Sequence, residues 1–408
     1  MESVLTLMPK PNQEKLPGKI HLLFVCYSPR NRKLAVIIIL LLFILTWYFF
    51  SQEYQQFLKY KLLQCNDGRC SSSSDIKERI DMLPSSSDGT SPSPQPHLEY
   101  NRSEFNPSTA EFHAIGDQYI VKYNQKLAPR RCNQPAFVVF AINSAARHFD
   151  QRFGIRQTWG NTSEFQQRIR IANLWRLIFI VGRTGNIKID RRVDEEARLF
   201  GDLVITDLIE HHHVLTEKTI LGMYWARRYC QTQFYYKGDD DVWINKWRLF
   251  DYLVTLSLRP TVNPSHCWIG FVSTMNRIPI RDKSSKYYIS YDNYPMDKFA
   301  PYCSGFGYFM TGQTADRLIW AIPYVQKIPG LDDVYIGLLA NVTHVEPTHN
   351  DDFHIYTNNA RYRNYTSNEL YHTMAEHGVN DAELMISFHR SARTKYVQLM
   401  DDQIIDTT

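Results

Sequence analysis

The sequence predicts an α/β domain with a mainly parallel central sheet, behind a single N-terminal transmembrane helix and a flexible stem. An uncharged apolar run lies near the N-terminus, and the region from residue 129 to 408 alternates short apolar strands with helical stretches. The chain has 408 residues, of which 44% are hydrophobic and 22% are charged. This composition excludes disorder throughout and gives enough chain for one large domain or two ordinary ones.

The apolar run covers Leu34–Phe50 and reads LAVIIILLLFILTWYFF. As a helix with a rise of about 1.5 Å per residue it spans roughly 26 Å, which is just enough to cross a bilayer. Arg30, Arg32 and Lys33 precede it directly, and the next basic residue after it is Lys59. The positive-inside rule then places residues 1–33 in the cytosol as a tail. A cleaved signal peptide is the alternative, but the run exceeds the usual ~7 to 15 apolar residues and no small-x-small site follows it.

The residues beyond this anchor have features of a protein segment that faces the secretory lumen. Six of the seven cysteines lie there, an even number that an oxidising compartment would allow to pair, and the sequence does not determine their pairing. Their spacing contains no C-x-x-C pair, which argues against a structural zinc site. Four N-glycosylation acceptor sequons also lie beyond the anchor, at Asn101, Asn161, Asn341 and Asn364.

Residues 51–128 are predicted to form a stem. Within them, the segment from 71 to 96 holds nine Ser and four Pro and is too polar to build a core. The formal net charge of +4 is too small to indicate a nucleic-acid partner. The 13% aromatic content suits a protein that offers ring faces to sugars, although for each residue taken singly packing in an aromatic-rich core is the stronger explanation.

Four apolar runs are predicted as strands of the sheet: Ala136–Ile142, Leu177–Val181, Leu203–Ile205 and Phe234–Lys237. Between the last two, Thr216–Gln231 has the spacing of a helix. Continuous apolar strands separated by helices are typical of a parallel sheet that is buried on both faces. In such sheets ligands bind beyond the carboxyl ends of the strands, so the residues that follow Lys237 are candidates for a site.

Three carboxylates, Asp239-Asp240-Asp241, follow the last of these strands. Crowded carboxylates repel one another, and hard cations such as Mg²⁺ or Mn²⁺ relieve that repulsion. Acidic capping of a helix is the alternative interpretation. A second acidic pair, Asp332-Asp333, could supply a general base, or it could equally begin a helix. The tract His211-His212-His213 is interpreted as a solvated loop, because adjacent side chains do not converge easily on one ion.

Several segments in order resemble the β-1,3-glycosyltransferase family, which includes the galactosyl- and N-acetylglucosaminyltransferases of the Golgi. Lys237–Asn245 (KGDDDVWIN) is close to K-x-D-D-D-V-F-V-N, and Asp332–Gly337 (DDVYIG) stands where the family has E-D-V-Y-[VT]-G, with Asp332 in place of the usual Glu. The other matching segments are Arg152, Ile155–Gly160, Phe179–Gly182, Gly201-Asp202, Asp207, Leu215–Thr219, Arg281–Lys283, Lys286–Ile289, Tyr302–Tyr308 and Phe388–Arg390.

The resemblance implies a GT-A fold that uses a UDP-sugar. Its metal ligands for Mn²⁺ or Mg²⁺ would be Asp239 and Asp241, with His389 as a late ligand, and Asp240 would help to hold the nucleotide-sugar. Asp333 would be the general base, with Asp332 as the alternative. The remaining candidates from the sequence are Arg156 and Lys237, which could bind the diphosphate or uridine or equally brace the sheet edge through an ion pair. Tyr287, Tyr288 and Tyr302 could line the acceptor or sugar pocket or equally pack in the core.

The function expected from this resemblance is an inverting, metal-dependent transfer of GlcNAc or Gal from a UDP-sugar to the 3-hydroxyl of a glycan on a glycoprotein or glycolipid. The protein would be a single-pass type II protein of the Golgi membrane with a lumenal catalytic domain at 129–408. The sequence chooses neither donor nor acceptor and leaves a homodimer open. A Golgi-anchored glycan-binding or scaffold protein without turnover is the alternative from another class, and a metal-dependent phosphohydrolase is a third.

Overall fold

The computed structural model describes residues 119–161, 175–272, 277–355 and 364–405. The predicted anchor at 34–50, nearly all of the predicted stem, Asn101 and the cysteines before Cys132 lie outside the described residues. Among the helices that the structure describes, none combines the length and the apolar character needed to span a bilayer.

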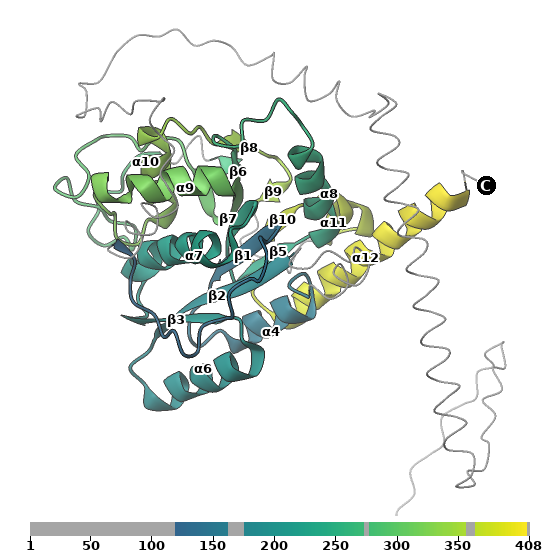
Figure 1. Cartoon of the computed structure of the whole chain (residues 1–408), viewed down its shortest axis with the longest axis horizontal. Helices are drawn as coiled ribbons and strands as arrows, with labels where there is room; N and C mark the ends of the chain where they lie inside the picture. Colours follow the sequence, from purple (N-terminus) through teal and green to yellow (C-terminus); the bar gives the residue numbers. More distant parts are fainter. Residues whose placement is uncertain (1–118, 162–174, 273–276, 356–363, 406–408) are drawn as a thin grey trace, which may run out of the picture. The chain divides into compact units, whose positions relative to one another are not determined.

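A seven-stranded sheet forms the centre of the fold, in the order β3-β2-β1-β4-β7-β6-β8 (Figure 1). Strands β1, β2, β3 and β4 are parallel to one another, whereas β7 pairs antiparallel with both β4 and β6. The predicted α/β class with a mainly parallel sheet is therefore confirmed. The strands are β1 (Val138–Asn143), β2 (Trp175–Arg183), β3 (Leu203–Ile209), β4 (Phe234–Asp239), β6 (Trp268–Val272), β7 (Cys303–Thr311) and β8 (Thr348–His349).

Both faces of the sheet are covered by helices, as the apolar runs predict. Along β1, Val138, Phe140 and Ile142 face one core cluster, while Val139 and Ala141 face the other, because successive side chains alternate across a strand. The first cluster also holds residues of α4 (Phe149–Gln157), α6 (Ile187–Phe200), α8 (Lys246–Ser257), α11 (Ser367–His372) and α12 (Ala382–Ile405). The second holds residues of α7 (Leu215–Cys230), α9 (Gly312–Ala321), η2 (Ile322–Tyr324) and α10 (Asp332–Val342).

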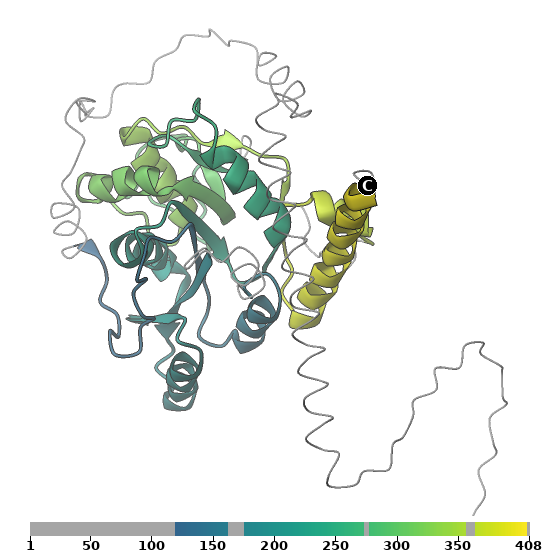
Figure 2. The same cartoon turned by 45° about the vertical axis from the view of Figure 1, so that its right-hand side comes forward.

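Helix α7 lies between the sheet and two other helices, and Figure 2 shows it in its layer from a second angle. It packs on β1, β2 and β4 and contacts α9 and α10. A Cβ atom at Gly222 would stand 2.9 Å from the Cβ of Ala141 on β1, so the absence of a side chain there allows the close approach of α7 to the sheet. The helix begins just after the short 3₁₀ turn η1 (His212–Val214).

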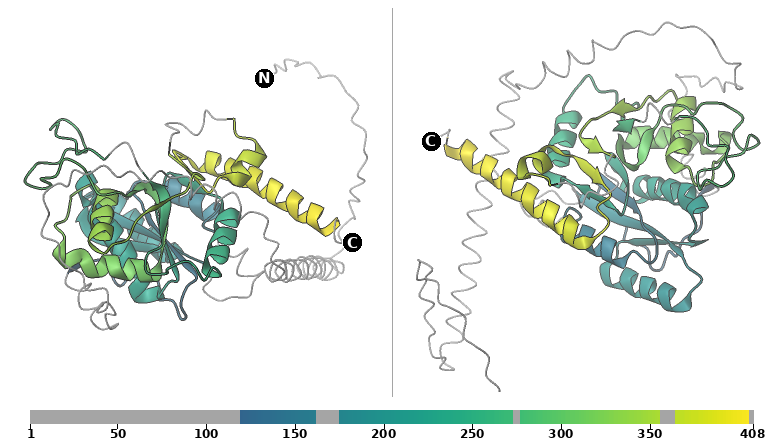
Figure 3. Two further views of the ribbon diagram at one scale, coloured as in Figure 1. Left: turned by 90° about the horizontal axis from the view of Figure 1, so that it is seen from above. Right: turned by 180° about the vertical axis from the view of Figure 1, so that it is seen from behind.

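A second, three-stranded sheet in the order β5-β10-β9 lies directly beyond the acidic triplet. Its strands are β5 (Val242–Ile244), β9 (Phe353–His354) and β10 (Ala375–His377), and β5 starts immediately after Asp241. The last helix, α12, packs on α4 and α11, and its C-terminal part extends away from the rest of the described domain (Figure 3).

Described residues before 129, the predicted start of the catalytic domain, also contact the central sheet. Tyr123 forms an antiparallel bridge with Thr206 of β3, and its hydroxyl hydrogen-bonds that of Tyr229 at 2.8 Å. A disulfide between Cys132 and Cys230 joins the segment before β1 to the end of α7. Cys267 and Cys303 are buried free thiols.

Candidate active site

The acidic triplet lies where the order of the strands in the sheet reverses. From β1, the chain continues to β2 and β3 on one side, whereas β4 lies on the other side of β1. The ends of β1 and β4 are level, because Asn143 is the register partner of Asp239. This is a topological switch point, and in open α/β sheets ligands bind in the crevice there. The triplet and the loop after β1 therefore occupy the position at which this architecture binds ligands.

Lys237 of β4 connects the two acidic groups that the sequence singles out. Its Nζ lies 3.0 Å from Oδ1 of Asp239 and 2.9 Å from Oδ2 of Asp332, and it also donates to the carbonyl of Gly305. The lysine side chain is 1% exposed. Burial opposes the charged form, but the neighbouring carboxylates outweigh it and raise the pKa of Lys237. Asp239 and the start of α10 are thus joined by one buried ammonium group.

Asp332 is also held from the helix side. Its Oδ2 accepts a hydrogen bond of 2.7 Å from the hydroxyl of Thr219 on α7, and that hydroxyl accepts one of 2.7 Å from the amide of Asn143. The Asp332 side chain is 6% exposed. With its Oδ2 shared between a lysine and a threonine, this carboxylate is a buried anchor for the cluster.

Asp333 differs from its neighbour because it is partly exposed. Its Oδ2 accepts the backbone N–H of Gly305 at 3.0 Å and its Oδ1 that of Val334 at 2.8 Å. Burial raises the pKa of Asp333 to about 6, the charge of Asp332 adds to that effect, and Lys237 and the two backbone N–H groups oppose it. Of the two predicted candidates for the base, Asp333 is the one that solvent or a substrate can reach.

Two aspartates and a histidine share a more open part of the site. The side chains of Asp239, Asp241 and His377 are 31%, 35% and 34% exposed. His377 ends β10, and its Nε2 lies 3.5 Å from Oδ2 of Asp241. Burial raises the pKa of Asp239 to about 7, and the charges of Asp332 and Asp241 add to the rise against the opposing charge of Lys237. Several carboxylates thus compete for one lysine, which leaves the site short of positive charge.

The late histidine next to the aspartates is His377 and not the predicted His389. On α12, the ring of His389 stacks on Trp247 at a centroid distance of 4.7 Å, and the neighbouring Phe388 packs edge-on against Trp243. The assignment of His389 as a late metal ligand stays a prediction, and the structure places His377 beside Asp241. The signal that marks His377 is its place at the end of β10, which pairs with β5 directly after the triplet.

Arg156 does not lie with the aspartates, contrary to the predicted nucleotide contact. Its guanidinium binds both carboxylate oxygens of Asp202 at 2.8 Å and Oε1 of Glu196 at 2.7 Å, and its side chain is 10% exposed. It therefore braces α4 against α6 and the start of β3. Asp240 is also committed, because His148 Nδ1 lies 2.9 and 3.1 Å from its two carboxylate oxygens.

The chain matches a family profile described as Galactosyltransferase over residues 150–351. It is 33% identical over 228 residues to "Beta-1,3-galactosyltransferase 1" of Homo sapiens and of Mus musculus, a match that covers 55% of this chain and 66% of each relative. It is 34% identical over 218 residues to "Beta-1,3-galactosyltransferase 5" of Gorilla gorilla gorilla, covering 52% of this chain and 68% of that relative. The chain belongs to the β-1,3-glycosyltransferase family.

The matched part of the chain spans slightly less than two thirds of the length of the first two relatives named above. The profile includes the acidic triplet and the Asp332-Asp333 pair, but it begins after His148 and ends before His377. The crystal structure of mouse xyloside xylosyltransferase 1 in its apo form also matches 53% of this chain and 85% of its own, at 10% identity and a TM-score of 0.23. A similarity that low carries no argument.

The three tyrosines predicted for a sugar pocket differ in exposure. The ring of Tyr287 is 42% exposed and meets the ring of His212 edge-on at 5.6 Å, and Tyr288 next to it is partly exposed. Tyr302 is 7% exposed and packs against Gly337 of α10, so it belongs to the core. In the histidine tract, His211 and His213 are exposed as predicted, whereas His212 is partly buried.

The asparagines of three predicted N-glycosylation sequons lie within the described residues. Asn161 follows α4, Asn341 lies in the last turn of α10, and Asn364 precedes α11. Each asparagine is exposed. Glycosylation at these positions stays a prediction.

Proposed function

We propose that this protein is an inverting glycosyltransferase that moves a hexosyl unit, GlcNAc or Gal, from a UDP-sugar to the 3-hydroxyl of an acceptor glycan on a glycoprotein or glycolipid. The product would carry a β-1,3 linkage. One observation supports this proposal above the others: the partly exposed carboxylate of Asp333 directly follows Asp332, and Lys237 joins Asp332 to Asp239 of the acidic triplet at the switch point of the sheet. The membership of the chain in a family whose relatives bear galactosyltransferase names adds to that support.

In the proposed reaction, Asp333 accepts the proton of the acceptor hydroxyl as that oxygen attacks the anomeric carbon of the donor sugar. A general base works best when its pKa lies near the working pH, and burial brings that of Asp333 to about 6. Its two backbone hydrogen bonds from Gly305 and Val334 fix the direction of the carboxylate. A single displacement from the face opposite the diphosphate inverts the anomeric centre and gives the β linkage.

The donor atoms next to the triplet fit a hard divalent cation, and we propose Mn²⁺ or Mg²⁺. In octahedral coordination, two neighbouring ligand atoms with metal bonds of about 2.1 Å lie about 3 Å from each other. Asp241 Oδ2 and His377 Nε2 are 3.5 Å apart, which is close to that spacing. No set of three or more His, Cys, Asp and Glu side chains encloses an ion within the described ranges. The protein would therefore supply few ligands, and water and diphosphate oxygens would supply the others. When bound, the cation would neutralise the charge that develops on the departing UDP.

Asp239 and Lys237 hold the rest of this region in place. Lys237 holds Asp239 next to the proposed metal position, and it holds Asp332, which directly precedes the proposed base Asp333. Because the lysine is buried and occupied by two carboxylates and a carbonyl, we propose that it orients the site and does not bind the diphosphate directly. The switch between β1 and β4 supports a GT-A arrangement in which the nucleotide lies at that edge.

We also propose that the protein is a single-pass type II protein of the Golgi membrane, anchored at 34–50, with its catalytic domain in the lumen. Three observations support this: the apolar run with basic residues before it, the exposed sequons, and the disulfide between Cys132 and Cys230. Disulfides persist in oxidising compartments, whereas cytosolic thiols are kept reduced.

The test is a donor and acceptor screen on the full-length protein in detergent. UDP-GlcNAc, UDP-Gal and UDP-GalNAc are each incubated with Mn²⁺ and a panel of β-galactoside and mannoside acceptors, and UDP release and product linkage are measured. We expect UDP release that depends on acceptor and metal, with a new β-1,3 bond by NMR. Absence of transfer with every pair, while UDP still binds, would favour a glycan-binding protein without turnover.

A further inference from the structure

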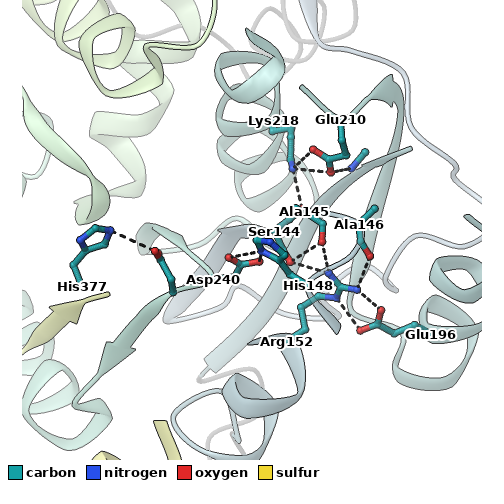
Figure 4. Close-up of polar contacts among 12 residues, drawn as sticks. Ser144, Ala145, Ala146, His148, Arg152, Glu196, Glu210, Lys218, Asp240 and His377 are labelled. Atoms are coloured by element: carbon teal, nitrogen blue, oxygen red, sulfur yellow. Dashed lines mark hydrogen bonds and ion pairs between the residues drawn. The ribbon is translucent and has the colours of Figure 1, made fainter. Parts of the chain in front are cut away.

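The loop between β1 and α4 is held rigidly at the switch point (Figure 4). The guanidinium of Arg152, which is fully buried, donates to Ser144 Oγ at 2.8 Å and to the carbonyl of Ala145 at 2.7 Å, and it pairs with Glu196 at 2.6 Å. From α7, Lys218 Nζ donates to the carbonyl of Ser144 at 2.9 Å. Two buried cations thus bind the inward-facing oxygens of this loop, which fixes the backbone that carries the next side chain toward the triplet.

That side chain is His148, at the end of the loop and at the N-cap position of α4. It makes no capping hydrogen bond to the helix, and its Nδ1 instead contacts both carboxylate oxygens of Asp240. A carboxylate only accepts hydrogen bonds, so Nδ1 carries the proton and the ring is oriented by Asp240. The other ring nitrogen, Nε2, has no hydrogen-bond partner among the residues that the structure describes.

The exposures of the two side chains show which of them a ligand can reach. The Asp240 side chain is 9% exposed, whereas that of His148 is 44% exposed. The middle carboxylate of the triplet therefore presents an imidazole to the switch point and keeps its own oxygens covered. A bound molecule at this edge would meet the ring of His148 before it met Asp240.

We propose that His148, oriented by Asp240, binds the nucleotide half of the donor through Nε2. This rests on the proposed function and identifies a donor-binding residue beyond the matched family segments. The ligand chemistry is an oxygen of a nucleoside diphosphate, either a ribose hydroxyl that donates to Nε2 or a phosphoryl oxygen that accepts from it. The acceptor glycan is the less suitable occupant, because the proposed base Asp333, at the start of α10, contacts Gly305, whereas His148 contacts Asp240 from the loop after β1.

Two conservative variants separate binding by His148 from mere support of Asp240. In His148→Asn the amide nitrogen takes the place of Nδ1 and can still donate to Asp240, but nothing remains at the position of Nε2. In His148→Gln the longer side chain brings an amide as far as Nε2. The matched control is His349→Asn, because His349 forms a 2.9 Å pair with Asp351 on the surface strand β8, away from the switch point.

The experiment measures the Kd of UDP, UMP and uridine for the full-length protein by calorimetry with Mn²⁺, together with the KM of donor and acceptor. We expect His148→Asn to weaken UDP binding by about 10- to 100-fold, the usual range for a lost hydrogen bond to a charged group. The acceptor KM should stay unchanged, His148→Gln should recover part of the loss, and His349→Asn should bind as the unaltered protein does. A loss seen with UDP and UMP alone assigns a phosphoryl oxygen, and a loss also seen with uridine assigns the nucleoside.

Unaltered UDP affinity in His148→Asn would overturn the inference and leave the proposed function standing. An equal loss in donor and acceptor KM would also overturn it, because that pattern indicates a displaced loop. If the unaltered protein binds no UDP, the proposed function and this inference both fail. The binding of UDP to the unaltered protein therefore distinguishes the two failures.

Discussion

Lys237 Nζ lies 2.9 Å from Oδ2 of Asp332, although 95 positions separate the two residues in the sequence. The same ammonium reaches Asp239, so a single buried cation joins Asp239, which lies next to the proposed metal position, to α10, which carries the proposed base Asp333. Each partner neutralises the other in a region where an uncompensated charge would be costly. The active-site geometry and the stability of the fold therefore depend on the same contact.

Replacing Lys237 by Met should lower the free energy of unfolding by about 3–5 kcal/mol, because it leaves buried carboxylates without their counter-ion. Chemical denaturation followed by fluorescence measures the change. Arg191→Ala is the matched control, since Arg191 pairs with Glu195 at 3.0 Å on the exposed face of α6 and an exposed helical pair contributes only about 0.3–0.5 kcal/mol. Equal stability of the two variants would contradict the role given to Lys237.

Replacing Asp333 by Asn should reduce kcat by about 10²- to 10⁴-fold, the usual contribution of a general base, with little change in the Kd of UDP. The amide keeps the size of the side chain but does not take up the acceptor proton. Asp332→Asn should instead lower the melting temperature, because Asp332 anchors Lys237 and Thr219. If Asp332→Asn removed activity without loss of stability and Asp333→Asn were active, the base would be Asp332.

The rate should fall on the acid side with an apparent pKa of about 6. Burial raises the pKa of Asp333 to that value, and only the carboxylate form can accept a proton, so kcat/KM should decrease about tenfold per pH unit below it. The contribution of the Asp333 carboxyl to the free energy of unfolding changes with pH in the opposite direction to the rate. The folded state holds the proton more tightly than the unfolded chain, so the contribution is full below about pH 4 and is lost as the pH rises through 6. A pH–rate profile with its limb near pH 4 would contradict the assignment.

His377→Ala should weaken the activation by Mn²⁺ by roughly tenfold or more, because it removes the imidazole beside Asp241. His389→Ala should leave the metal titration unchanged and lower the melting temperature, because that ring stacks on Trp247. Titration of the rate with Mn²⁺ and electron paramagnetic resonance of bound Mn²⁺ measure both variants. The reverse pattern would restore the assignment that the sequence alone suggested.

Much of the fold is predictable from short-range patterns. The runs around β1, β2, β3 and β4 are apolar on both faces, which predicted a buried parallel sheet, and the helical spacing after Val214 predicted α7 to within a residue or two. The position of the acidic triplet at a strand end also follows from the sequence, because the apolar run stops there.

The sequence by itself determined the α/β class, the placement of the triplet at the end of β4 and the candidacy of Asp333. Only the tertiary structure decided that His377 and not His389 stands beside Asp241, that Arg156 pairs with Asp202, and that His148 covers Asp240. Periodicity reports which face of an element is buried, over a few residues at a time. These contacts instead join residues between 46 and 136 positions apart, and the order and register of the strands fix which of them meet.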